Sequence, residues 1–175
     1  RDALCAAAEF ILVVESLGQS RGGLVATVGE IAISPDASNV IPGEARLSLD
    51  LRHPNDVVRE RADDELRSRA AAIAAERGVT TTWEPVHETA AVVCNRQLTL
   101  LLEAAVKRHQ SEAPLLASGA GHDAARMAEL CPAAMLFVRC KGGISHSPEE
   151  SASEVDVSVA LTVMHDFLNS LAKTT

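Results

Sequence analysis

Hydrophobic and polar positions repeat with two different periods in the first half of the chain. Apolar residues recur at helical spacing over residues 4–12, and Gly18 stands where a C-terminal cap is expected. Residues 24–33 are rich in Val, Ile and Thr and predict a strand. In residues 45–52, Ala and Leu alternate with Arg, Ser and Asp. This alternation predicts a strand of an antiparallel sheet with one buried face.

A long amphipathic helix and one further strand complete this half. Residues 56–77 carry one apolar stripe on an otherwise charged surface, and Gly78 follows them. Residues 79–83 predict a strand. The order helix, strand, strand, helix, strand is that of a ferredoxin-like unit without its first strand. The chain also begins inside a helical pattern without a methionine, so we expect it to be a fragment of a longer protein. The predicted stripe consists of Val58, Ala62, Leu66, Ala70 and Ile73.

The pattern changes near residues 87–93, and we place a domain boundary between residues 88 and 89. Asn95 is expected to cap a helix that carries Leu and Ala on one face and extends to His109. Ser153, with an acidic residue three positions later, is expected to cap a final helix. The apolar stripe of that helix is predicted to be Val155, Val159, Val163 and Phe167.

Between these helices, two apolar segments each lead into a glycine-rich loop. Residues 115–117 and 133–138 predict short buried strands, and residues 123–130 predict a helix between them. Strand, helix and strand in this order are typical of an α/β crossover. Loops that follow buried strands are common positions for binding and catalytic residues.

Composition narrows the classes of function. The chain has 175 residues, is 47% hydrophobic and only 2% aromatic, which predicts an aliphatic core in one domain or two small ones. A net charge of −8 argues against a nucleic-acid partner. We expect no membrane partner, because no apolar run approaches the roughly 20 residues that span a bilayer. The scattered cysteines indicate reduced thiols in a cytoplasmic protein. They are Cys5, Cys94, Cys131 and Cys140.

The first candidate site is the loop that contains His146. Two glycines precede this histidine, and Pro148 follows it. An imidazole here can be a metal ligand, a general base or a hydrogen-bonding group, although most loop histidines are solvated. Glu149 and Glu150 can add carboxylates, or they can be a charged approach to the last helix.

The second candidate site is the glycine turn of residues 118–123. Free backbone N–H groups at a helix start suit a carboxylate or another anion. The alternative is a tight turn in which His122 and Asp123 cap the helix. The turn lacks the Gly-Lys-Ser/Thr ending of a phosphate-binding loop, so nucleotide binding is not expected.

The third candidate site is the polar face of the predicted strand at residues 45–52. Arg52 can grip a carboxylate through two parallel hydrogen bonds, and Asn39, on the loop before the strand, can assist it. The alternative is a solvated sheet face with an Asp–Arg pair formed by Asp50.

Four segments together resemble a known family. They are residues 38–43 (Ser-Asn-Val-Ile-Pro-Gly), 49–54 (Leu-Asp-Leu-Arg-His-Pro), 118–124 (Ser-Gly-Ala-Gly-His-Asp-Ala) and 142–148 (Gly-Gly-Ile-Ser-His-Ser-Pro). In this order they resemble the allantoate amidohydrolases and N-carbamoyl-L-amino-acid hydrolases, including β-ureidopropionase relatives. These enzymes belong to the two-metal aminoacylase/carboxypeptidase superfamily. The resemblance extends from residue 1 to about residue 173, and the last two segments are its most specific part.

The resemblance implies an α+β and α/β architecture in two parts. Residues 1–88 would be an incomplete ferredoxin-like lid that also forms a homodimer. Residues 89–175 would be the closing part of an α/β zinc-peptidase-like catalytic domain. The implied reaction is hydrolysis of a linear C–N bond in a carbamoyl or ureido substrate that carries a carboxylate.

The resemblance also implies roles for single residues. His146 is similar to the last ligand of a site for two divalent ions, which can be Zn, Mn, Co or Ni. Asn39 and Arg52 are similar to lid residues that hold the substrate carboxylate. The substrate-pocket loop would be formed by Gly119, Gly121 and His122. The general-base glutamate and the other ligands would lie in segments outside this chain, so we expect this chain alone not to turn over substrate.

Two kinds of function stay open on the sequence. The favoured interpretation is part of a metal-dependent amidohydrolase, for which N-carbamoyl amino acids, allantoate and dipeptides are all candidate substrates. The rival interpretation is a non-catalytic dimerisation or binding module that keeps the segments as relics.

Overall fold

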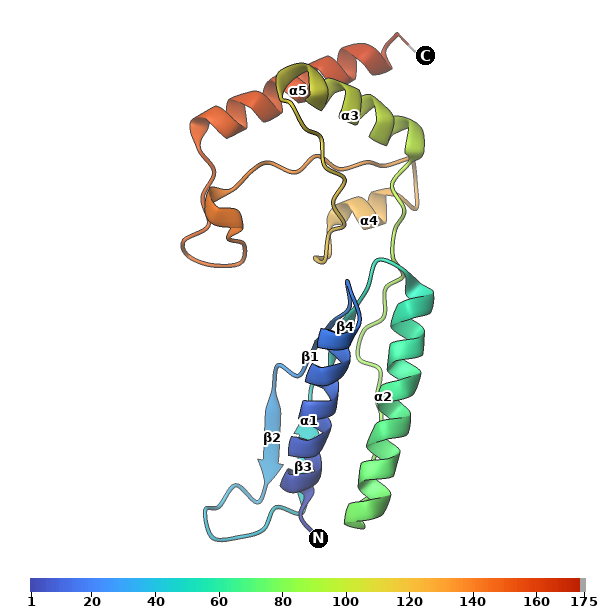
Figure 1. Cartoon of the computed structure of the whole chain (residues 1–175), viewed down its shortest axis with the longest axis vertical. Coiled ribbons are helices and arrows are strands. Elements are labelled where there is room, and N and C mark those ends of the chain that lie inside the picture. Colours follow the sequence, from blue (N-terminus) through green and yellow to red (C-terminus); the bar gives the residue numbers. More distant parts are fainter. Residues whose placement is uncertain (174–175) are drawn as a thin grey trace. The chain divides into compact units, whose positions relative to one another are not determined.

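The computed structural model describes residues 1–173, which mix helices with a few short strands in an α+β arrangement. They form two compact units, one of residues Arg1–Ala91 and the other beginning at Val92. Figure 1 shows the order of elements along the chain. Each unit has its own hydrophobic core, and each core is built mainly by a pair of helices.

The first unit begins with helix α1, Ala3–Ser20. The Asp2 carboxylate caps it by accepting a hydrogen bond of 3.0 Å from the backbone N–H of Cys5. The helix continues past Gly18, so the prediction of a cap at that glycine is wrong. A Cβ at Gly18 would lie 3.4 Å from the Ala26 side chain. The glycine therefore permits close packing of the helix against the following strand.

The strands of the first unit form one interrupted antiparallel ladder. Strand β1, Val25–Thr27, pairs with β4, Asp50–Arg52, and β2, Ile31–Ser34, pairs with β3, Glu44–Leu47. Between the two pairs, residues 28–30 lie opposite residues 48–49. The extra residue on one side interrupts the pairing as a β-bulge does. Each of the two long strands predicted over residues 24–33 and 45–52 is thus divided into two short ones, which form two separate two-stranded sheets.

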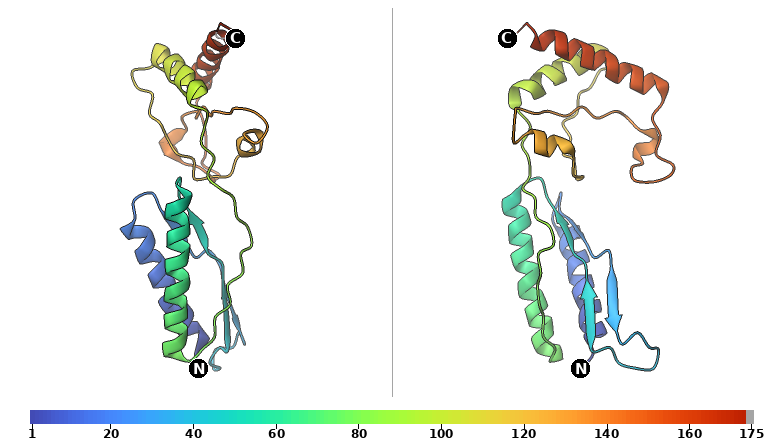
Figure 2. Two further views of the ribbon diagram at one scale, coloured as in Figure 1. Left: turned by 90° about the vertical axis from the view of Figure 1, so that its right-hand side faces the viewer. Right: turned by 180° about the vertical axis from the view of Figure 1, so that it is seen from behind.

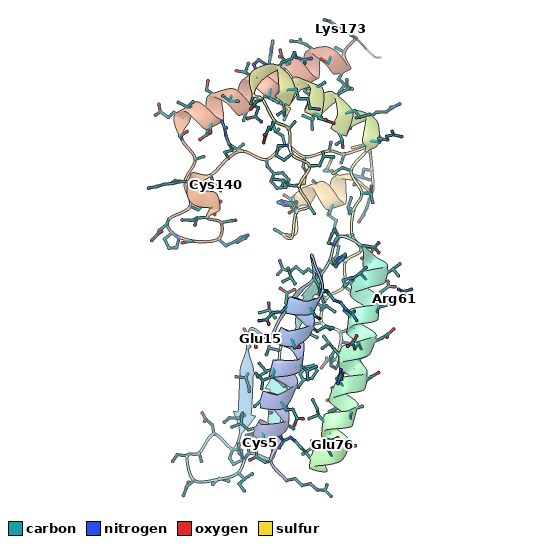
Figure 3. All side chains as sticks on the ribbon, in the orientation of Figure 1. Cys5, Glu15, Arg61, Glu76, Cys140 and Lys173 are labelled. Atoms are coloured by element: carbon teal, nitrogen blue, oxygen red, sulfur yellow. The ribbon has the colours of Figure 1, made fainter. Side chains whose placement is uncertain are left out.

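Helix α2, Asp56–Arg77, has the predicted bounds. Asn55 caps its start, and Gly78, at φ 65°, ends it in the left-handed conformation that glycine adopts without strain. Ala62 and Leu66 of the predicted stripe are fully buried. Both α1 and α2 cover the same face of the strand ladder (Figure 2). Their exposed charged residues include Glu15, Arg61 and Glu76, which Figure 3 labels.

The segment after α2 is not the predicted third strand. Residues 79–83 belong to no strand of the described chain, and most of their side chains are exposed. Trp83 nevertheless packs on the core: its ring meets Phe10 edge-on at 6.0 Å, and the Arg67 guanidinium lies 4.8 Å from its centre. The chain then returns along α2, where the Asp56 carboxylate accepts hydrogen bonds of 3.0 and 3.1 Å from the N–H of Ala91.

The second unit is held by α3, Arg96–His109, and α5, Glu154–Leu171. Their predicted caps are confirmed: Asn95 accepts from the N–H of Leu98, and Ser153 accepts from the N–H of Asp156. The α5 stripe is confirmed in part, because Val155 is exposed. The buried residues of this core are Leu102, Ala105, Val106, Val163 and Phe167.

The rest of the second unit is less regular than predicted. Helix α4, Asp123–Met127, is shorter than the expected 123–130, and η1, Lys141–Gly143, is a single 3₁₀ turn. Neither residues 115–117 nor residues 133–138 form a strand within the described residues, and several of their apolar side chains are exposed. A strand needs a hydrogen-bonded neighbour, and residues 92–173 form no sheet in this structure.

Helix α1 qualifies the expectation that no segment is suited to a membrane. By length and composition, Ala3–Ser20 is apolar enough to cross a bilayer, and it is the one such helix in the described residues. Its side chains Phe10, Val14 and Leu17 instead pack in the core of the first unit. A core helix of this kind passes the same test, so the finding is weak evidence for a membrane span.

Leu66→Ala should destabilise the first unit by about 2–5 kcal/mol, because it leaves a cavity at a fully buried position. Trp83 is the single tryptophan of the chain, so urea unfolding followed by its fluorescence reports on this unit. The control is Leu12→Ala in α1, where the side chain is 64% exposed and a change within about 0.5 kcal/mol is expected. Equal losses in the two variants would contradict the assigned core.

Asp166 should make the α3–α5 pair sensitive to acid. The pKa of its carboxyl is lowered, first by the hydrogen bond with His109 at 2.6 Å and then by Arg108. Because the pKa is lower in the folded state than in the unfolded state, the ionised Asp166 contributes to the stability of the fold. This contribution is fully present above the ordinary carboxyl pKa of about 3.9 and is lost as the pH falls through the folded-state pKa. Asp166→Asn should flatten this acid loss, measured by urea unfolding with circular dichroism at several pH values. Glu112→Gln, at an exposed position, should leave it unchanged.

Candidate functional site

The His146 loop has an unusual backbone. Gly142 and Gly143 have φ values of 65° and 70°, and His146 itself has φ 57°. His146 is the one described non-glycine residue with a positive φ. This conformation is uncommon for a residue with a side chain and is found most often at functional sites. The loop begins after Cys140, which Figure 3 labels.

A carboxylate supports this strained position. The backbone N–H of His146 donates a 2.9 Å hydrogen bond to Oε2 of Glu150. Glu150 therefore closes a short loop back onto the histidine, and its carboxylate serves the backbone. The side chain of His146 is exposed. The sequence left Glu150 as either a metal ligand or a charged residue before the last helix. In the structure its carboxylate instead shapes the loop by accepting from the His146 N–H.

The described residues do not by themselves assemble a metal centre. No group of three or more His, Cys, Asp or Glu side chains is placed to hold an ion among residues 1–173. His146 is thus a candidate ligand without companions in this part of the chain. A site for two ions would need further ligands from elsewhere.

The glycine turn at residues 118–123 places its histidine directly before α4. His122 occupies the N-cap position of α4, as the alternative interpretation expected, but its side chain makes no capping hydrogen bond to the helix. Its Nε2 instead lies 2.6 Å from Oγ of Ser118. Helix α4 has five residues, so its N-terminus is a weak anion site. Gly119 and Gly121 are exposed. A Cβ atom placed on either glycine would meet no atom within 4 Å apart from those of its neighbours in the chain.

Arg52 lies on β4 and is paired within its own strand. Its Nε and Nη2 donate hydrogen bonds of 2.8 and 2.5 Å to the two carboxylate oxygens of Asp50. The hydrogen bonds that Arg52 donates to Asp50 are the main cause of the raised pKa of Arg52. The predicted Asp–Arg pair of a solvated sheet face is therefore present. The same two-point geometry is the one that a substrate carboxylate would need.

Asn39 is distant from Arg52 within one chain. Asn39 lies in the loop that joins β2 and β3, beyond the pair Ser34 and Glu44, whereas Arg52 pairs with Val25 at the other end of the ladder. The residues from 44 to 52 alone span about 26 Å at ~3.3 Å per residue. Figure 2 shows this loop and β4 at opposite ends of the first unit. One chain does not bring these two predicted carboxylate-binding residues together.

Residues 5–170 match the profile of Peptidase family M20/M25/M40. The chain belongs to this family. The predicted resemblance is confirmed by individual relatives as well. The chain is 39% identical over 201 residues to a probable allantoate deiminase of Oryza sativa subsp. japonica, covering 98% of this chain and 41% of that protein.

Two further M20 relatives indicate the same group. An N-carbamoyl-L-amino acid amidohydrolase of Geobacillus stearothermophilus is 37% identical, covering 99% of this chain and 42% of the relative. A crystal structure of an amidase of the hydantoinase/carbamoylase family from Burkholderia multivorans superposes with a TM-score of 0.88 at 34% identity, covering 97% of this chain and 42% of that one. The chain thus spans about 41% of the length of the curated relatives it matches.

The sequence does not indicate the roles of two residues of the M20 chain that contact candidate site residues. The Ser118 hydroxyl contacts His122. The Glu150 carboxylate, a candidate metal ligand on the sequence, instead accepts from a backbone N–H. The spacing of four between the members of each pair was the available signal, but such spacing has no fixed meaning outside a helix.

Glu150→Ala should free the backbone N–H of His146 and speed its hydrogen exchange, because that N–H then loses its acceptor. The measurement is amide exchange of His146 by NMR. Glu149→Ala removes a neighbouring carboxylate from the same loop and is the matched control. A similar acceleration in both variants would show that the Glu150 contact does not hold the loop.

Proposed function

We propose that this chain is part of an amidohydrolase that cleaves a linear C–N bond in an N-carbamoyl amino acid or in allantoate. The observation that carries the proposal is the M20 match over residues 5–170, together with named relatives of these two activities. Because the chain spans about 41% of such a relative, the activity belongs to an enzyme of the relatives' full length that contains this sequence. We call this the full-length enzyme.

In this proposal the first unit is a lid and the second is the closing part of the catalytic domain. Arg52 binds the substrate carboxylate through its two-point guanidinium, exchanging the carboxylate of Asp50 for that of the substrate. His122, on its glycine turn, lines the pocket and hydrogen-bonds a polar atom of the substrate. The M20 resemblance supports these roles, and the exposure of both side chains is compatible with ligand access.

His146 is the one residue of this chain that we propose as a metal ligand. The strained loop and its exposed imidazole suit a ligand held in a fixed direction. The described residues supply no further cluster, so no step of hydrolysis is assigned to a metal on this chain. A metal held by His146 with ligands from outside this chain would activate water for attack.

The separation of Asn39 and Arg52 supports a homodimer with shared sites. If both residues bind one carboxylate, we expect them to come from two copies, because within one chain they lie at opposite ends of the paired strands, of which residues 44–52 alone span about 26 Å. A symmetric pair of lids would give two such sites, each with Arg52 of one copy and Asn39 of the other.

The proposed activity is tested by assaying the full-length enzyme against allantoate, a panel of N-carbamoyl-L-amino acids and a dipeptide. We expect hydrolysis of the first or second class and loss of at least about 100-fold in His146→Ala. The 175-residue chain alone should be inactive. If the full-length enzyme hydrolyses none of the three substrates, the alternative of a non-catalytic dimerisation module gains support. If it hydrolyses only the dipeptide, the substrate class is dipeptides and not carbamoyl or ureido compounds.

The shared site is tested by mixing two inactive variants. Asn39→Ala and Arg52→Ala should each raise KM strongly in homodimers of the full-length enzyme, because each dimer then lacks one partner of the carboxylate at both sites. After subunit exchange, half of the dimers should be mixed and should have one intact site of two. The mixture should therefore recover about a quarter of the wild-type activity at low substrate. No recovery after verified exchange would place both residues in one subunit's site, or outside the site.

A further inference from the structure

The direction of the contact between Ser118 and His122 depends on which ring nitrogen of His122 carries the proton. Ser118 Oγ lies 2.6 Å from Nε2 of His122, 3.3 Å from the carbonyl oxygen of Ala120 and 3.2 Å from its backbone nitrogen. The N–H of Ala120 donates to the hydroxyl. The hydroxyl hydrogen then has two candidate acceptors, the Ala120 carbonyl and the His122 ring.

The distances favour the ring. An N–H group that donates to oxygen usually lies about 2.9–3.0 Å from it, whereas hydroxyl donors make shorter contacts, near 2.7–2.8 Å to oxygen, so the 2.6 Å separation favours the hydroxyl as donor, and the 3.3 Å contact with the Ala120 carbonyl is long. With this assignment Ser118 accepts one hydrogen bond from Ala120 and donates one to His122. The opposite arrangement would make the hydroxyl accept twice and donate only through the long contact. In the favoured assignment, Nε2 of His122 accepts the hydrogen bond and carries no proton.

A neutral imidazole carries its proton on one nitrogen only. We propose that Ser118 is a positioning residue that holds His122 as the Nδ1–H tautomer and so presents an N–H donor to the substrate. This role rests on the proposed function, in which His122 lines the substrate pocket. The complementary group on the substrate is an oxygen acceptor, such as the carbonyl of the carbamoyl or ureido group.

The turn itself supports a positioning role. Ser118 and His122 are separated by two glycines and Ala120, and glycine adds no side chain that could pack against the ring. The Ser118 hydroxyl is fixed by the Ala120 N–H, and it fixes the ring in turn. Partners that orient a histidine in this way commonly decide its tautomer.

Another histidine of the chain provides an internal reference with the opposite tautomer. Nδ1 of His53 accepts a 2.9 Å hydrogen bond from the backbone N–H of Asn55. His53 is therefore expected to carry its proton on Nε2. The two rings should give opposite patterns in one spectrum.

The first experiment needs no substrate. Long-range proton–nitrogen NMR of the 175-residue chain at about pH 8, above the ordinary histidine pKa of about 6.5, distinguishes protonated from unprotonated ring nitrogens. We expect a protonated Nδ1 in His122 and a protonated Nε2 in His53. Ser118→Ala should move His122 toward the Nε2–H form that predominates for histidine in water, while Ser118→Thr, which keeps the hydroxyl, should preserve Nδ1–H. A protonated Nε2 in wild-type His122 would overturn the proposal.

The second experiment tests the consequence in the full-length enzyme. Ser118→Ala should lower kcat/KM about 10- to 100-fold, the usual range for a partner that orients a functional histidine, and Ser118→Thr should restore most of it. Unchanged kcat/KM in Ser118→Ala, in an enzyme that His122→Ala inactivates, would overturn the positioning role. If His122→Ala is itself fully active while the NMR assignment holds, the pocket role of His122 fails and the tautomer assignment stands.

Discussion

Burial of small and aliphatic side chains between paired helices is the constraint on which the rest of this chain depends. In the first unit, Ala62 and Leu66 of α2 are fully buried against α1 and the strand ladder. In the second unit, Ala105 of α3 is fully buried and Val163 of α5 nearly so. Alanine at these positions lets helices approach closely, which suits a chain with 2% aromatic residues. Candidate site residues are carried by the strands and loops attached to these pairs.

The helices were predictable because their signals are local. The stripe of α2, its Asn55 cap and the glycine at residue 78 all lie within the segment that they define. Strands depend on partners elsewhere in the chain. Residues 79–83, 115–117 and 133–138 have suitable side chains, but they are unpaired as strands in the described structure. The bulge opposite residues 48–49 was also unpredictable, because register comes from pairing and not from composition.

Some features of the candidate site could likewise be predicted from local sequence, and others could not. Motif order identified Arg52, His122 and His146, and the M20 match supports that resemblance. The alternation of residues 45–52 also indicated the Asp50–Arg52 pair, because strand residues two apart lie on the same face. Sequence did not indicate that Asn39 lies at the far end of the ladder. Thirteen positions in sequence give no distance until the β2–β3 turn is known.

The Asp50–Arg52 pair gives a physical account of how an acidic chain can accept an anionic ligand. With a net charge of −8, the chain as a whole repels a carboxylate substrate, and only local cations can offset this. Asp50 offsets the charge of Arg52 through a salt bridge of 2.5 Å. Both side chains are about half exposed, so the pair is worth little in water and is easily exchanged. A substrate carboxylate would replace one two-point contact with another of the same geometry. On the proposed function, its advantage would come from a second contact made by Asn39 of the other copy, and selectivity would then depend on the length of the ligand and not on its charge alone.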